Sequence, residues 1–194
     1  MVPVPGTERD SYQRTDTRPP PLAVQTMFYF KSAGFRGQDL HQDQFYLKAK
    51  PGTCVAAWLA LDVCDVENGC LQVVPESGDL PVLCAENADI SKSFTDVTVH
   101  LPDMLHSEPV IMEPGDVLFF NGSVIHGNKP NTSHDRFGRS LIGHYVTGET
   151  REVSKFYKPV LDLSGNDVIF EESEGGGPCG KWIEKNGETH VVVA

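Results

Sequence analysis

The chain has 194 residues, enough for one domain with a sizeable core, and 39% hydrophobic and 22% charged residues are ordinary for a globular protein. Sixteen basic against 27 acidic side chains give a net charge of −11, so a nucleic-acid backbone or an anionic membrane would be repelled. We therefore expect neither nucleic acid nor membrane as a partner. Because no leader-like apolar segment opens the chain and no apolar run reaches about 18 residues, we expect a cytoplasmic location.

Cysteine usage points the same way. The five cysteines are odd in number and contain no Cys-X-X-Cys pair, which favours a reducing compartment. Each lies among apolar or turn residues, so we expect small buried side chains rather than reactive thiols or disulfides. They are Cys54, Cys64, Cys70, Cys84 and Cys179.

The N-terminal part divides into a connector and a strand. Residues 1–22 are rich in proline and show no apolar period, which indicates a tail or connector ahead of a single domain over residues 23–194. Residues 23–31 alternate Val24, Thr26, Phe28 and Phe30 with Gln25, Met27 and Tyr29, the period of a strand.

The middle of the chain predicts a hairpin and a long loop. Residues 53–63 form an apolar run with Trp58 near its centre, typical of a buried strand. The turn at residues 67–69 predicts that residues 70–74 pair back against that strand. Residues 77–108 are looser in composition, and a loop of that length is usually functional, typically a lid.

Two short strands around a glycine turn follow, over residues 117–120 and 124–127, and the second contains His126. Residues 139–146 alternate again, with Arg139, Leu141, Gly143 and Tyr145 on one face. We expect Arg139 to face the core, where an arginine needs an anion as partner.

Many short strands without helical periodicity predict a mainly β protein, a jelly roll or double-stranded β-helix. If His41 and Asp43 lie in one extended strand, their side chains share a face. With His126 they match the two-histidine, one-carboxylate triad of non-haem Fe(II) oxygenases. Such a triad leaves three positions open, two for a chelating 2-oxo acid and one for O2.

The order and spacing of several motifs resemble the phytanoyl-CoA dioxygenase family of Fe(II)- and 2-oxoglutarate-dependent oxygenases. The likeness runs from about residue 25 to residue 145. Its motifs are Leu40-His41-Gln42-Asp43 with Tyr46, Trp58-Leu59-Ala60-Leu61, Glu67-Asn68-Gly69-Cys70-Leu71, Val74-Pro75, Pro114-Gly115-Asp116, and His126-Gly127 with Pro130-Asn131 and Arg139.

This resemblance implies His41, Asp43 and His126 as iron ligands, with Arg139 as the clamp for the distal carboxylate of 2-oxoglutarate. Arg136 is the rival clamp, because the loop after His126 is longer than is usual in the family. Trp58 and Met27 match positions that line the co-substrate pocket, with ordinary core packing as the alternative. The remaining histidines are taken as structural: His100, His106, His134, His144 and His190.

The implied activity is hydroxylation of an aliphatic C–H bond of a small organic substrate, with succinate and CO2 as co-products. Retention of Asp43, where related halogenases carry a small residue, favours hydroxylation over halogenation. From the resemblance we also expect the helical region that family members have ahead of the Met27 strand to be shortened or absent. Either a second copy of the subunit covers the exposed sheet face, or the chain is a low-activity or non-catalytic binding module.

Overall fold

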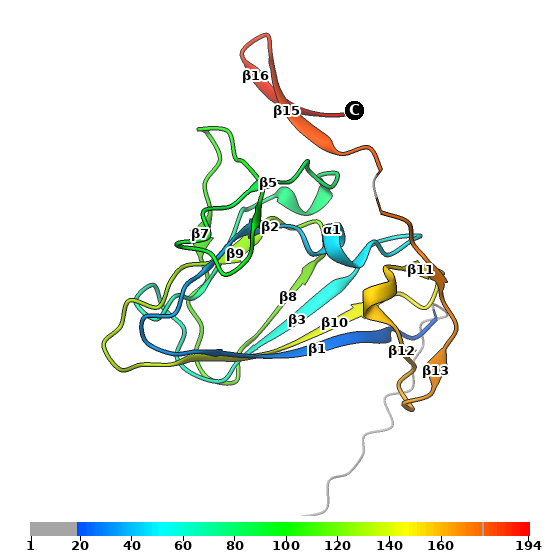
Figure 1. Ribbon diagram of the computed structural model, residues 1–194, viewed down its shortest axis with the longest axis horizontal. Helices are drawn as coiled ribbons and strands as arrows, with labels where there is room; N and C mark the ends of the chain where they lie inside the picture. The colour runs from blue at the N-terminus through cyan, green and yellow to red at the C-terminus, as the bar shows by residue number, and fades with distance from the viewer. Residues whose placement is uncertain (1–18, 176) are drawn as a thin grey trace, which may run out of the picture.

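The protein, described by a computed structural model over residues 19–175 and 177–194, is built around two antiparallel sheets that lie one over the other (Figure 1). The connector expected over residues 1–22 lies outside the described residues as far as residue 18. Leu22 already belongs to the first strand, where its side chain is buried.

The major sheet has six strands. Their order across the sheet is β13 (Asp167–Val168), β12 (Val160–Leu161), β1 (Leu22–Lys31), β10 (Gly138–Val146), β3 (Val55–Ala60) and β8 (Val117–Asn121). The predicted strands over residues 23–31, 53–63 and 117–120 are confirmed as β1, β3 and β8. Strand β10 lies centrally, paired with β1 on one side and β3 on the other.

The minor sheet has four strands and faces the major one. Its order is β2 (Gln38–His41), β9 (His126–Asn128), β4 (Leu71–Val73) and β7 (Glu108–Pro109). The prediction that residues 70–74 pair back against residues 53–63 is wrong, because β4 pairs with β9 and β7. The Asn68 amide, which donates to the carbonyls of Val63 and Phe137, makes the turn a corner between the sheets.

Short elements fill the connections. They are α1 (Asp43–Leu47), two 3-10 turns η1 (Ser77–Asp79) and η2 (Lys155–Tyr157), and the strand pairs β5 (Glu86–Asn87) with β6 (Val97–Thr98), β11 (Glu152–Val153) with β14 (Glu171–Glu172), and β15 (Gly180–Lys185) with β16 (Glu188–Val193). None of the helices in the described chain is long and apolar enough to cross a membrane.

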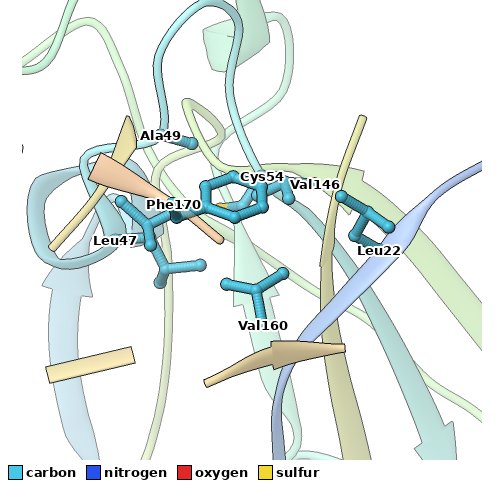
Figure 2. Close-up of a cluster of buried hydrophobic side chains, with 8 residues drawn as sticks. Leu22, Leu47, Ala49, Cys54, Val146, Val160 and Phe170 are labelled. Atoms are coloured by element: carbon cyan, nitrogen blue, oxygen red, sulfur yellow. The ribbon is translucent and has the colours of Figure 1, made fainter. Parts of the chain in front are cut away.

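Clusters of buried hydrophobic side chains hold the elements around the two sheets in place. One cluster joins the start of β1 and the end of β10 to α1 and β12 (Figure 2). Another consists of Val74, Leu83, Val99 and Ile125. Leu40, the residue before His41, packs against it, as do Trp182 and Val191 of the C-terminal β15–β16 hairpin. The indole of Trp182 also donates to the carbonyl of His100. These two clusters fix α1 and β2, the elements that carry the candidate ligands.

The cysteines divide into two groups. Cys54, Cys64 and Cys70 are buried and free, as predicted. The prediction is wrong for Cys84 and Cys179, which form a disulfide with their Cα atoms 4.9 Å apart. Residue Leu83 forms a parallel bridge with Gly180, so the C-terminal hairpin brings together two cysteines 95 positions apart. Sequence spacing alone carries no signal for such a contact.

Candidate metal centre and its cavity

His41, Asp43 and His126 converge between the two sheets, and all three are buried. One ligand atom from each lies within 4.8 Å of the other two. Asp43 Oδ1 is 3.6 Å from Nε2 of His41 and 3.6 Å from Nε2 of His126. The two histidines are direct partners in the pairing of β2 with β9.

The backbone sets the orientation of both imidazoles. His41 Nδ1 lies 2.9 Å from the carbonyl oxygen of Asp39, and His126 Nδ1 lies 3.0 Å from that of Val124. Each Nδ1–H therefore donates to the carbonyl two residues earlier, which leaves Nε2 as the lone-pair nitrogen. Both Nε2 atoms face Asp43, which is the arrangement a metal ion needs.

Asp43 reaches the site from a helix rather than from the expected strand. Strand β2 ends at His41, Gln42 is extended, and Asp43 is the first residue of α1. The buried Gln42 side chain points away and is held by the carbonyls of Pro81 and Ser123 and by the amide of Leu83. The strand expected through residue 43 is therefore wrong, although the two ligands still share one side of the chain.

A fourth residue, His144, touches the cluster. Its side chain is 3% exposed, and its Nε2 lies 3.0 Å from Oδ2 of Asp43, the oxygen that faces away from the other histidines. Its Nδ1 is buried and has no hydrogen-bond partner among the residues that the structure describes. From sequence alone, His144 counts among the structural histidines. The alternation of β10 would have identified it, because His144 lies on the same face of the strand as the buried residues Ser140 and Ile142.

The surroundings fix the charges of the cluster. Burial raises the pKa of the Asp43 carboxyl, yet the imidazoles around it, His126 first, outweigh burial and hold that pKa well below its usual range. Burial lowers the pKa of His126 to about 4, against the opposing effect of Asp43. At neutral pH the pair is a carboxylate and a neutral imidazole, the forms in which both bind metal.

A cavity of about 250 Å³ opens beside the three ligands. Met27 and Trp58 both line it, on the inner face of the major sheet, where Met27 pairs with Ile142 and Ile142 with Trp58. The other lining residues are Gln25, Tyr29, Gln38, Tyr46, Leu47, Leu71, Phe94, Thr95, Phe120, Asn128, Ile142, His144 and Tyr157, together with the three ligands. Among these residues there is no lysine and no arginine.

Neither candidate clamp lines this cavity. Buried residues on β10 are Ser140, Ile142, His144 and Val146, so Arg139 lies on the opposite, outer face. There its guanidinium makes two bonds to the Asp62 carboxylate, of 2.8 and 2.6 Å. Arg136 instead pairs with Asp65 and Glu67. The expectation that Arg139 faces the core is wrong, because the inner face belongs to the alternate residues of its strand.

The donor set fits iron. Two neutral imidazoles and one carboxylate on one side of a cavity match the ligands of a non-haem Fe(II) centre and leave the cavity side open. The buried hydroxyl of Tyr46, a cavity residue without a hydrogen-bond partner in the described chain, is a polar group that awaits a ligand.

Comparison with known proteins gives one consistent result. Residues 9–139 match the family described as phytanoyl-CoA dioxygenase (PhyH). Phytanoyl-CoA dioxygenase 1 of Oryza sativa subsp. japonica is 31% identical over 137 residues, covering 70% of this chain and 48% of the rice protein. The chain therefore spans about half the length of this relative.

Two solved structures share the fold. ThoJ, a non-haem monooxygenase in its apo form, superposes with a TM-score of 0.61 at 18% identity, covering 81% of this chain and 58% of ThoJ. EvdO2 from Micromonospora carbonacea var. aurantiaca, complexed with 2-oxoglutarate, gives a TM-score of 0.52 at 20% identity, covering 63% of this chain and 52% of EvdO2. The predicted jelly roll is confirmed. Since the matching residues 9–139 also contain all three candidate ligands, the chain belongs to the phytanoyl-CoA dioxygenase family.

Proposed function

We propose that this chain is an Fe(II)- and 2-oxoglutarate-dependent oxygenase that hydroxylates an aliphatic C–H bond of a small organic substrate. The observation that carries the proposal is the buried cluster of His41, Asp43 and His126 beside a cavity between the two sheets. Family membership and the bound 2-oxoglutarate of EvdO2 support the same reading.

Iron bound at these three residues would supply activation of O2, coupled to oxidative decarboxylation of the 2-oxo acid. In balance, 2-oxoglutarate, O2 and a C–H bond give succinate, CO2 and an alcohol, with one oxygen atom entering succinate and the other the product. Asp43 keeps a carboxylate in the ligand set, which favours hydroxylation over halogenation. His144 contacts the second oxygen of that carboxylate, Oδ2, while Oδ1 faces His41 and His126.

The cavity wall limits what can react there. Its inner surface is mainly aromatic and apolar, with Trp58, Phe94 and Phe120 among the side chains that exclude water from the ligands. Together with the net charge of −11, this wall favours a small neutral substrate over a highly anionic one.

A non-catalytic binding module is the second candidate, and one observation favours it. Among the described residues, no arginine or lysine lines the cavity, although the co-substrate is a dianion, and Arg139 is engaged by Asp62 on the outer face. In such a module a metal or a small acid would bind without turnover.

Succinate formation separates the two candidates. Wild-type protein loaded with Fe(II) should release succinate from 2-oxoglutarate in air with ascorbate, and His126→Ala should not. His190→Ala is the matched control, because the half-exposed His190 side chain lies on β16, where its ion-pair partner is Glu188. If wild type binds Fe(II) yet forms no more succinate than His126→Ala, the chain is a binding module.

A further inference from the structure

Lys31, the last residue of β1, is a buried cation without a counter-ion. Its side chain is 5% exposed, and its ammonium donates to the carbonyls of Gly69 and Lys129, both at 2.7 Å, and to Oδ1 of Asn128 at 2.5 Å. All three acceptors are neutral, and no ion pair within residues 19–175 and 177–194 includes Lys31.

Burial lowers the pKa of Lys31 to about 8, so most of the population is still charged at pH 7. A buried charge is costly unless an opposite charge or a metal accompanies it. The geometry is therefore that of a cation for which an anion is missing, close to the cavity beside the candidate metal ligands.

Asn128 connects this cation to the cavity. It follows His126 by two residues on β9, so both side chains lie on one face of the minor sheet, and both line the cavity. Lysine can only donate, so Oδ1 of Asn128 must be the atom that faces Lys31. The Nδ2 amide, which makes no hydrogen bond within the described chain, is thereby left as a donor for a ligand.

The inner face of the major sheet has no competing cation. Lys31 pairs directly with Gly138 across β1 and β10, and residues paired in this way share a face of the sheet. Gly138 has no side chain, so the position opposite Lys31 is empty, and the neighbouring Arg139 points outward. Lys31 is the one buried lysine or arginine in the described chain.

Spacing along β9 suits a dicarboxylic acid. Two residues of strand separate His126 from Asn128 by about 7 Å along the chain. Building on the proposed function, we propose that Asn128, with Lys31 behind it, anchors the distal carboxylate of the 2-oxo acid whose other end lies at His41, Asp43 and His126. The anchor takes the role that the sequence assigned to Arg139.

Two 2-oxo acids test this anchor without turnover. Each acid is titrated into Mn(II)-loaded protein, and calorimetry measures its affinity. The two acids are 2-oxoglutarate and 2-oxobutyrate, which lacks the distal carboxylate. Lys31→Met should weaken binding of 2-oxoglutarate by about 10- to 100-fold, because it removes the positive charge behind the Asn128 amide that contacts the distal carboxylate. Binding of 2-oxobutyrate should change less than about twofold, since its contacts lie at the metal. Arg139→Met, the matched control, should leave both acids unchanged.

Asn128→Asp is the second variant, chosen because its carboxylate would pair with Lys31 and keep the site folded. It should repel the distal carboxylate and lose the preference for 2-oxoglutarate while retaining 2-oxobutyrate. Mn(II) binding reports that each variant is folded, because neither residue is a metal ligand. If Lys31→Met does not bind Mn(II), the test of the anchor rests on Asn128→Asp alone.

Three results would overturn the anchor. If Asn128→Asp binds Mn(II) and still prefers 2-oxoglutarate to 2-oxobutyrate, Asn128 is not the anchor, and the proposed function is unaffected. Loss of the preference in Arg139→Met returns the role to that arginine. Wild type that binds Mn(II) but neither acid, or that binds no Mn(II), overturns the proposed function and the anchor together.

Discussion

The two faces of the major sheet are built by alternate residues of the same strands, yet they differ in what they do. On the inner face Met27, Ile142 and Trp58 form a row across β1, β10 and β3 that lines the cavity. One residue further along, the outer row is Phe28, Leu141, Leu59 and Val117, across β1, β10, β3 and β8. Pairing register thus decides which set meets the metal ligands.

The outer face is apolar but exposed. Phe28 is 58% exposed and Phe119 is 69% exposed. Phe28 stacks on Phe30, and Phe30 contacts Phe137, so these three rings form one patch at the β1 side of the sheet. Soluble proteins seldom leave such patches uncovered. The contrast teaches that strand alternation marks two apolar faces, and only the polar residues interspersed among them distinguish the functional one.

Removing a metal ligand from the inner face should have the largest effect on Fe(II) binding. His41→Ala, Asp43→Ala and His126→Ala should each abolish stoichiometric Fe(II) binding, because two remaining ligands hold a labile divalent ion poorly. Anaerobic calorimetry measures the loss. Binding at wild-type affinity in any one variant would remove that residue from the ligand set.

Acid should destabilise the metal-free protein through His126. Its pKa is lowered to about 4 by burial, whereas an unfolded chain would protonate it near 6.5. Between these values the unfolded state binds the additional proton, so stability falls as pH drops from about 6.5 to about 4, by about 3 kcal/mol in total.

Urea unfolding of metal-free wild type and His126→Gln across this pH range measures that loss. The variant lacks the titrating imidazole, so the part of the pH dependence that comes from His126 should be absent from it. Identical slopes in the two proteins would show that His126 is not the group responsible.

His144 sharpens the comparison, since it lies on the inner face without being one of the three ligands. Removing its hydrogen bond to Asp43 by His144→Phe should weaken metal binding about 10- to 100-fold, the usual effect of losing a partner that orients a ligand. His144→Gln, which retains an amide donor, should recover part of the affinity. The visible spectrum of the Co(II)-loaded protein should shift in His144→Phe and remain unchanged in the exposed-surface control His190→Ala.

Local pattern was enough to predict much of this molecule. The alternation of β1, the apolar run of β3 and the motifs around His41 and His126 predicted the strands, the jelly roll and the residues that converge. Met27 and Trp58 also lie on the cavity wall, and their contact with the co-substrate stays a prediction.

What failed depended on register and on distant contacts. On β10 both alternating sets contain apolar residues, so the period fixes two faces without saying which is inside, and that ambiguity misplaced Arg139 and hid His144. The pairing of Cys84 with Cys179 and the burial of Lys31 arise from segments far apart in sequence. No local pattern encodes such contacts.

A charge introduced on the outer face should have the smallest effect on Fe(II) affinity and on stability. Phe119 points away from the cavity and is mostly exposed, so Phe119→Lys should leave Fe(II) affinity unchanged and shift the free energy of unfolding by less than about 0.5 kcal/mol. Covering of this face by a second copy of the chain stays a prediction, and sedimentation velocity of wild type and Phe119→Lys measures it. If wild type is a dimer and Phe119→Lys is a monomer, the result supports a second copy covering this face. If Phe119→Lys instead remains monomeric like wild type but loses Fe(II), the two faces are coupled through the strands, and their separation in this structure does not describe the working protein.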